Sequence, residues 1–90
     1  MNTWDEAKRQ ATLRERGLDF ADAELIFQGR RYYTQSDDRR DYGEVRWITA
    51  GYLFKRFVVV VWTGTDENRR IISMRHGHGR EERRFRKYLD

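Results

Sequence analysis

The chain has 90 residues and no cysteine, and its 19 lysine and arginine residues outnumber its 15 aspartate and glutamate residues. This length suits one small domain over residues 1–90, and the lack of cysteine excludes a disulfide framework and a cysteine-based zinc site. The longest apolar run, about six residues, is too short for a membrane span, and the opening MNTWDEAKRQ lacks a signal-peptide core. We therefore expect a soluble, cytoplasmic protein without membrane contact.

Arginine dominates the positive charge of the chain. The sequence holds 16 arginines against 3 lysines and carries a formal net charge of +4. A guanidinium group matches the fork of a phosphate better than an ammonium group does. This composition favours nucleic acid over an acidic protein as the class of ligand.

Two helices are predicted at the beginning of the chain. Asp5 can cap a helix over residues 5–16, and Gly17 is suitable as the residue that ends it. Asp19 can cap a second helix, which Gly29 would end. The apolar residues of this second segment recur with helical spacing, so we expect one of its sides to be buried.

Strand-forming residues follow. Residues 30–34 favour a strand, and the polar run over residues 35–42 predicts a loop. Residues 45–53 favour a second strand, in which Gly51 would mark the end or a bulge.

The last third of the chain contains the clearest strand. Residues 57–62 (FVVVVW) are apolar on both faces, and a polar turn connects them to another predicted strand over residues 70–74. A charged helix over residues 80–89 would close the chain. Because the connections are short, the fold class is α+β, with two N-terminal helices, an antiparallel sheet of about four strands and a C-terminal helix.

Positive charge gathers where the last strand ends. Arg75, His76 and His78 follow its apolar residues directly. Five more cations come close behind, namely Arg80, Arg83, Arg84, Arg86 and Lys87. A site for an anion is the first hypothesis for this region.

Five short blocks of the sequence carry a family resemblance. They are WDEAK at 4–8, RGLDF at 16–20, GEVRW at 43–47, the VVVV run at 58–61, and IISMR at 71–75 with Glu81 following. In their order and spacing they resemble the BrnT toxins of bacterial type II toxin–antitoxin systems. The resemblance implies a RelE-like fold and an endoribonuclease that needs neither metal nor cofactor and inhibits translation. It also implies a BrnA antitoxin with a ribbon-helix-helix DNA-binding region, whose complex with the toxin binds operator DNA.

The chain departs from the family pattern at several positions. Thr12 and Arg16 stand where the family commonly has Asn and His, and residues 76–79 (HGHG) replace a segment that usually contains alanine. Phe85 stands where a late tyrosine is usual, and its ring cannot donate a proton.

Cleavage of RNA without a metal requires a base for the ribose 2′-OH, cations for the phosphate and a proton donor for the leaving oxygen. Resemblance and chemistry both assign Arg75 to the phosphate, although a solvated strand end would also explain an arginine there. Glu44 and Arg46 lie two residues apart on a predicted strand and would share one face, beside Arg75 if the strands are neighbours. Glu44 would then be the base, and Arg46 would be a second cation that binds the phosphate. A structural salt bridge explains this pair almost as well.

The two histidines have three possible roles. Histidine exchanges protons near neutral pH, so His76 is a candidate for acid–base catalysis. His76 and His78 could instead bind a metal, but no third ligand is evident and we expect none. As a third possibility, both are surface histidines on a glycine-rich connection.

Further residues are candidates for RNA binding. Arg80, Arg83 and Arg84 can contact phosphates, and Tyr42 can stack on a base. Lys55, at a predicted turn of the protein, can contact the RNA backbone. Packing of the tyrosine within a strand and simple solubility of the lysine are the alternatives. The sequence therefore favours an endoribonuclease toxin, with a non-catalytic nucleic-acid-binding or co-repressor module as the alternative and a pure protein-interaction domain as a third.

Overall fold

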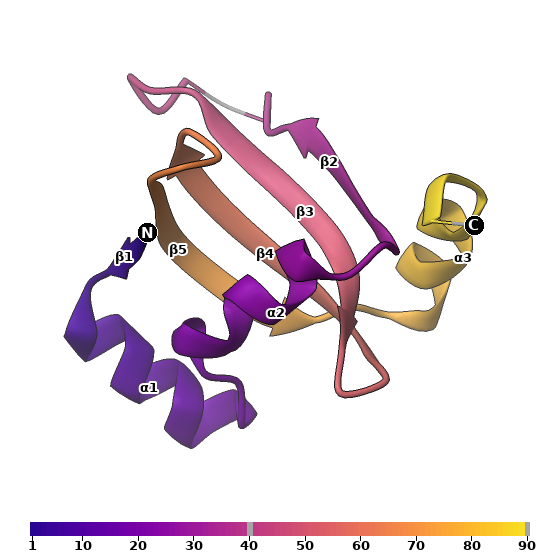
Figure 1. The fold of residues 1–90 in the computed structure, drawn as a ribbon, viewed down its shortest axis with the longest axis horizontal. Helices are drawn as coiled ribbons and strands as arrows, with labels where there is room; N and C mark the ends of the chain where they lie inside the picture. Colours follow the sequence, from indigo (N-terminus) through magenta and orange to yellow (C-terminus); the bar gives the residue numbers. More distant parts are fainter. Residues whose placement is uncertain (40, 90) are drawn as a thin grey trace.

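The computed structural model describes residues 1–39 and 41–89 and has an α+β fold (Figure 1). In chain order the elements are β1 (Asn2–Trp4), α1 (Glu6–Arg16), the 3-10 helix η1 (Phe20–Asp22), α2 (Ala23–Gln28), β2 (Tyr32–Ser36), β3 (Arg46–Leu53), β4 (Arg56–Gly64), β5 (Arg69–His76) and α3 (Gly79–Leu89). The strands form a five-stranded sheet in the order β1-β5-β4-β3-β2. Across the described residues, no helix is long and apolar enough to span a membrane.

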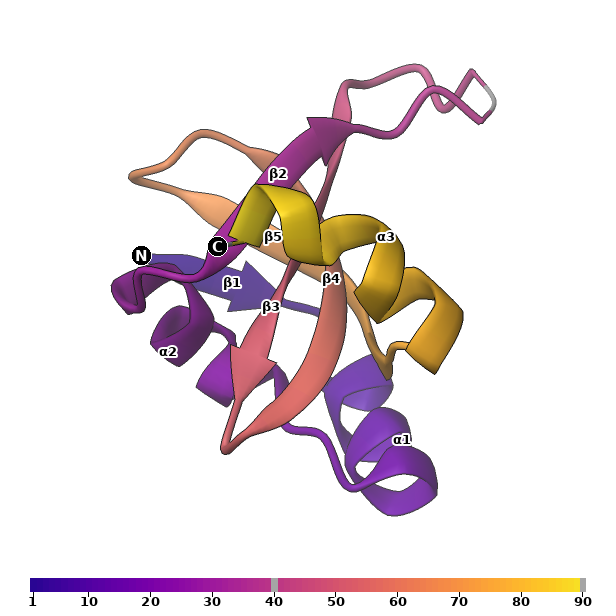
Figure 2. The ribbon, with the colours of Figure 1, turned by 90° about the vertical axis from the view of Figure 1, so that its right-hand side faces the viewer.

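Helices cover both faces of the sheet. Helix α2 lies on one face and α3 on the other, and α1 packs against β5 and η1 at the edge of the sheet (Figures 1 and 2). Central strand β4 is buried on both sides, since Val58 and Val60 join the cluster under α2 whereas Phe57 and Val59 join the cluster under α3. This confirms the prediction of a strand that is apolar on both faces.

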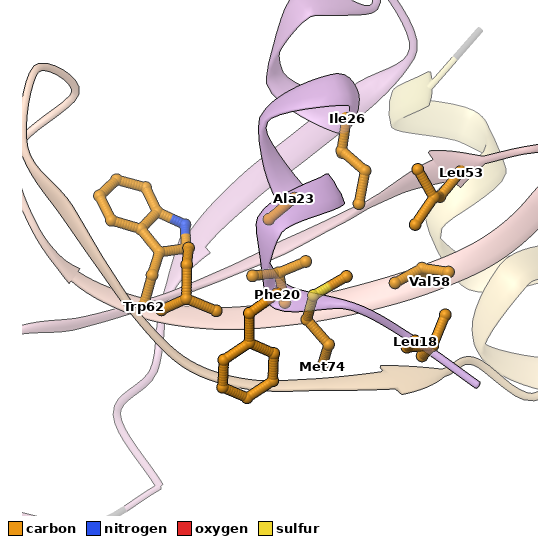
Figure 3. Close-up of a cluster of buried hydrophobic side chains, with 10 residues drawn as sticks. Leu18, Phe20, Ala23, Ile26, Leu53, Val58, Trp62 and Met74 are labelled. Atoms are coloured by element: carbon orange, nitrogen blue, oxygen red, sulfur yellow. The ribbon is translucent and has the colours of Figure 1, made fainter. Parts of the chain in front are cut away.

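The larger core lies between α2 and the sheet. Ala23 and Ile26 point from α2 onto the strands, and Trp62 lies at the end of the cluster farthest from Leu18 (Figure 3). Its ten buried members are Leu18, Phe20, Ala23, Ile26, Leu53, Val58, Val60, Trp62, Ile71 and Met74. Burial of these side chains is the main force that holds α2 on the sheet.

The ends of the first helix agree with the sequence prediction. The Asp5 carboxylate accepts a hydrogen bond from the backbone N–H of Lys8, and Gly17 ends α1 with a left-handed φ of 68°. The predicted second helix is only partly correct. Asp19 accepts from the N–H of Ala21 and thereby caps the 3-10 turn η1, and the short helix α2 begins only after that turn.

Strands β2 and β3 differ in detail from the prediction. Strand β2 begins and ends two residues later than expected, so residues 35 and 36 are strand and not loop. Gly51 lies inside β3, where neither an end nor a bulge occurs. A Cβ atom at this position would lie 2.7 Å from Cγ2 of Ile26, so glycine lets α2 approach the sheet. The register shift occurs instead between Val61 and Trp62 of β4.

Strand β1 was not predicted. It pairs with β5 in parallel, with Asn2 beside Arg69 and Trp4 beside Ile71. The prediction of a wholly antiparallel sheet of four strands behind two helices is therefore wrong at this edge. Strands β2 to β5 are antiparallel to their neighbours, as the short connections indicated.

Candidate active site

A shallow hollow lies where β5 ends, between the last turn of α1 and the first turn of α3. Its volume is about 470 Å³, and it is lined by Glu15, Arg16, Arg75, His76 and His78. A second hollow of about 500 Å³ continues along α3 and is lined by His78, Gly79, Arg80, Glu81, Arg83 and Arg84. Most of the cationic residues predicted at the end of the last strand therefore border two adjoining depressions, whereas Arg86 and Lys87 are not among the residues that line them.

Arg75 is held by a carboxylate. Its Nη1 and Nη2 atoms each donate a hydrogen bond of 2.7 Å to one oxygen of Glu81. Glu81 also accepts a 3.0 Å hydrogen bond from the backbone N–H of His78. The Arg75 guanidinium is the main reason that the pKa of Glu81 falls to about 2, and Glu81 in turn raises the pKa of Arg75. Both groups are therefore charged at neutral pH.

The ion pair leaves part of the Arg75 fork unused by Glu81. Both contacts to the carboxylate use the terminal nitrogens, so Nε and the adjacent second N–H of Nη2 form another donor edge. The Arg75 side chain is 39% exposed. A phosphate can therefore approach Arg75 from the side while Glu81 keeps the guanidinium in place.

His76 is fixed by the end of α1. Its Nε2 atom lies 3.1 Å from the carbonyl oxygen of Arg16, and a carbonyl can only accept. Nε2 therefore carries the proton in the neutral ring, and Nδ1 is the atom that can take one up. The Arg16 guanidinium donates a 2.7 Å hydrogen bond to the carbonyl of Met74, which attaches α1 to β5.

Glu44 and Arg46 lie away from this hollow. Glu44 precedes β3 in a loop and pairs with Arg46 at 3.1 Å. Across the sheet, Arg46 is level with Thr63 on β4 and with Arg70 on β5. Arg70 is ~16 Å from Arg75 along β5, so Arg46 is at the opposite end of the sheet from Arg75. Because β4 also lies between β3 and β5, the expectation that Glu44 and Arg46 meet Arg75 from a neighbouring strand is wrong.

The predicted RNA-binding residues divide between the two ends of the sheet. Arg80, Arg83 and Arg84 are exposed on α3, beside the hollows. Lys55 lies in the turn before Phe57, whose carbonyl accepts from the N–H of Gly77, so this turn is at the same end. Tyr42 is at the other end, where the Arg46 guanidinium lies 3.9 Å from the centre of its ring.

Two residues that shape the candidate site, Arg16 and Glu81, were not predicted to contribute to it. Arg16 stands out in the sequence only as a departure from the family pattern, since its contact with Met74 joins residues 58 positions apart and no local pattern predicts it. Glu81 follows the IISMR block in the family resemblance, and the sequence alone assigns it no partner. A signal was present in its spacing, since a carboxylate three residues after an N-terminal cap is typical of a capping box, and Glu81 stands three residues after His78.

Within the residues that the structure describes, no three histidine, aspartate or glutamate side chains come together as a metal-binding group. A search of curated proteins found no match for the chain. A family model described as "Ribonuclease toxin, BrnT, of type II toxin-antitoxin system" matches residues 4–81. Such systems pair a toxin with an antitoxin, so an antitoxin partner follows from the match. Since the match covers most of the chain, the protein belongs to the BrnT family of ribonuclease toxins.

Proposed function

We propose that this toxin is an endoribonuclease that cuts RNA by metal-independent general acid–base chemistry in the hollow at the end of β5. The observation that supports this site most strongly is the Arg75 guanidinium, which is held beside His76 and His78 with one donor edge left by Glu81. The family assignment supplies the substrate class, and the hollow supplies the groups that the chemistry needs.

In the proposed reaction, Nδ1 of His76 takes the proton of a ribose 2′-OH. The 2′-oxygen forms a bond to phosphorus as the bond from phosphorus to the 5′-oxygen breaks. Protonated His78 gives a proton to the departing 5′-oxygen. The products are a 2′,3′-cyclic phosphate and a 5′-hydroxyl, and Arg75 and Arg16 stabilise the charge on the phosphate oxygens.

The other candidates for proton transfer are less suitable. A pKa of about 2 makes Glu81 a weak base, and Glu44 lies at the other end of the sheet. Phe85 is buried against Tyr33 and Phe57 under α3 and has no proton to give. The histidines therefore take both roles, and Glu81 positions Arg75.

The RNA chain would continue from the cleavage site along α3. Arg80, Arg83 and Arg84 border the second hollow and would contact successive phosphates, with Lys55 on the adjacent turn. Such contacts bind RNA without regard to its sequence. We assign the fold to the RelE-like type, on the basis of the α+β architecture and the helix that follows the last strand.

The partner in this account is a BrnA-like antitoxin with a ribbon-helix-helix region. It would cover the cationic surface around Arg75, Arg80 and Arg83 with an acidic or amphipathic segment, and bring the complex to operator DNA in the cytoplasm. Association between such surfaces slows as salt screens the charges.

Separate measurements of cleavage and binding test this proposal against a non-catalytic nucleic-acid-binding module. His76→Gln keeps a side-chain donor for the Arg16 carbonyl but cannot transfer protons. We expect cleavage of a single-stranded RNA to fall on the order of 10² or more, as for loss of a general acid–base group, while its binding stays unchanged. The proposed site would be contradicted if wild type and His76→Gln cleaved RNA at the same rate, or if neither of them cleaved it.

A further inference from the structure

A further depression, apart from the two at the end of β5, lies on the face of the sheet that carries α2, beyond the end of the main core. Figure 3 shows Trp62 at that end of the core cluster. The depression has a volume of about 530 Å³, and we call it the aromatic groove. Its lining comprises Tyr32, Thr34, Trp47, Trp62, Gly64, Thr65, Asp66 and Glu67.

The floor of the aromatic groove is fixed by packing and hydrogen bonds. Trp47 and Trp62 are in contact, with ring centroids 6.1 Å apart. Nε1 of Trp62 donates a 2.8 Å hydrogen bond to the hydroxyl of Thr49, which is itself 2.8 Å from the hydroxyl of Thr34. The groove is therefore already formed before any partner binds, which lowers the entropic cost of binding.

The rim of the groove is acidic, in contrast to the +4 charge of the whole chain. Asp66 and Glu67 are both exposed at the turn between β4 and β5. Two cations lie nearby: Arg69 lies over the ring of Phe27 at 3.7 Å and pairs with Glu24 and Asp66, and the N-terminal ammonium of Met1 donates a hydrogen bond to the backbone carbonyl of Glu67. The carboxylates of Glu24, Asp66 and Glu67 outnumber these two cations, so the rim keeps a net negative charge and repels phosphate.

The aromatic groove is separate from the candidate active site. Trp62 is in register with Ile71 on β5, whereas the hollow lies at the opposite end of that strand, beyond Arg75. The two surfaces also differ in charge, because arginines border the hollow and carboxylates border the groove. The groove therefore suits an apolar or aromatic side chain with a cation beside it, which an RNA chain does not offer.

We propose that the aromatic groove anchors the antitoxin, through a segment in which an apolar or aromatic side chain is flanked by lysine or arginine. One wall of the groove is β2, the last strand of the sheet, so one side of its backbone has no strand neighbour. An extended antitoxin segment laid along β2 would direct alternate side chains into the groove. The identity of the bound partner, an antitoxin, rests on the family assignment. It does not depend on the proposed mechanism of cleavage.

One antitoxin chain can reach both surfaces. The toxin measures 32 × 29 × 23 Å along its principal axes, and about ten extended residues span ~33 Å. A basic or apolar segment in the groove and an acidic segment over the arginines can therefore belong to one partner. The segment in the groove then holds the antitoxin on the toxin and does not compete with RNA, because RNA binds at Arg75.

The test measures the affinity of the toxin for the purified product of the gene adjacent to its own. Glu67→Lys and Asp66→Lys change exposed rim residues, so the fold should be retained, as a melting curve would verify. We expect each to weaken the complex at least tenfold at low salt and less at high salt. Glu15→Lys makes the same charge change at the far hollow and should not weaken it.

Hydrogen exchange of the free and bound toxin locates the contact independently. We expect protection of β2 and of the turn over residues 64–68 in the complex. Protection confined to α3 and the end of β5, with rim variants that bind normally, would overturn the proposal. Rim variants that abolish self-association of the toxin but bind the antitoxin normally would also overturn it, and would assign the groove to a second copy of the chain.

Discussion

Arg75 and Glu81 form an ion pair with two 2.7 Å hydrogen bonds, which joins the end of β5 to the first turn of α3. Glu81 also accepts from the backbone N–H of His78, so one carboxylate fixes both the guanidinium and the start of the helix. The contact connects an arginine predicted to bind phosphate with a glutamate to which the sequence assigned no role. Its geometry determines which edge of Arg75 a phosphate can meet.

Arg75 should be required for cleavage in a way that lysine cannot fully replace. Arg75→Ala is expected to lose on the order of 10² or more in cleavage rate, because it removes an electrostatic donor to the phosphate. Arg75→Lys should recover part of that loss, since an ammonium keeps the charge but not the fork. Rates on one RNA substrate at saturating concentration give the comparison.

Arg70→Ala is the matched control for Arg75→Ala. Arg70 lies on the same strand, is exposed and is five positions from Arg75. Its loss should leave the cleavage rate within about threefold of wild type, since surface substitutions away from a site have small effects. If Arg75→Ala and Arg70→Ala cleave at the same rate, Arg75 has no part in cleavage and only forms the ion pair with Glu81.

The Arg75–Glu81 pair should make stability depend on pH in the acidic range. The pKa of Glu81 is lowered from 4.5 to about 2, chiefly by Arg75. A carboxylate whose pKa is lower in the folded than in the unfolded protein stabilises the fold at pH values above the unfolded pKa. This stabilisation is lost as the pH falls through the folded pKa. The melting temperature of wild type should therefore exceed that of Glu81→Gln at pH 6, and the difference should shrink between pH 4.5 and 2.

Glu67→Gln provides the reference for this pH series, since Glu67 is exposed at the turn between β4 and β5. Its melting temperature should follow that of wild type at every pH. A gap between wild type and Glu81→Gln that stays constant down to pH 2 would show that the ion pair does not stabilise the fold.

The connection between β5 and α3 should tolerate alanine at one glycine and not at the other. A Cβ atom at Gly77 would overlap the ring of Phe57, which is buried in the smaller core. Gly77→Ala should therefore lower the free energy of unfolding by about 1–3 kcal/mol, as overpacking does. At Gly79 the nearest atom is Nη1 of Arg83 at 3.5 Å, so Gly79→Ala should be neutral or slightly stabilising. Urea denaturation measures both, and equal effects would contradict this packing.

The sequence predicted those parts of the fold that local signals determine. Asp5 and Gly17 mark the ends of α1 because a cap and a left-handed glycine act within one turn of the helix. Strand β1 has only three residues, and its partner strand β5 lies more than 60 residues later in the chain. No local pattern could predict that pairing. The position of Gly51 inside β3 depends likewise on the approach of Ile26 from α2.

The candidate site was predicted in part for the same reason. Arg75, His76 and His78 are close in sequence, so their grouping at the end of β5 followed from the strand itself. The expected meeting of Glu44 with Arg75 depended on the order of strands across the sheet. Two consecutive hairpins already place β4 between β3 and β5, and this order separates the two residues.

One measurement tests directly whether side chains alone carry out the cleavage. Purified toxin, freed of its antitoxin, is incubated with RNA in excess EDTA, and the ends of the products are identified. We expect cleavage at the rate seen without EDTA, with 2′,3′-cyclic phosphate and 5′-hydroxyl ends that Arg75→Ala fails to produce. Activity abolished by EDTA and restored by a divalent ion would contradict the account.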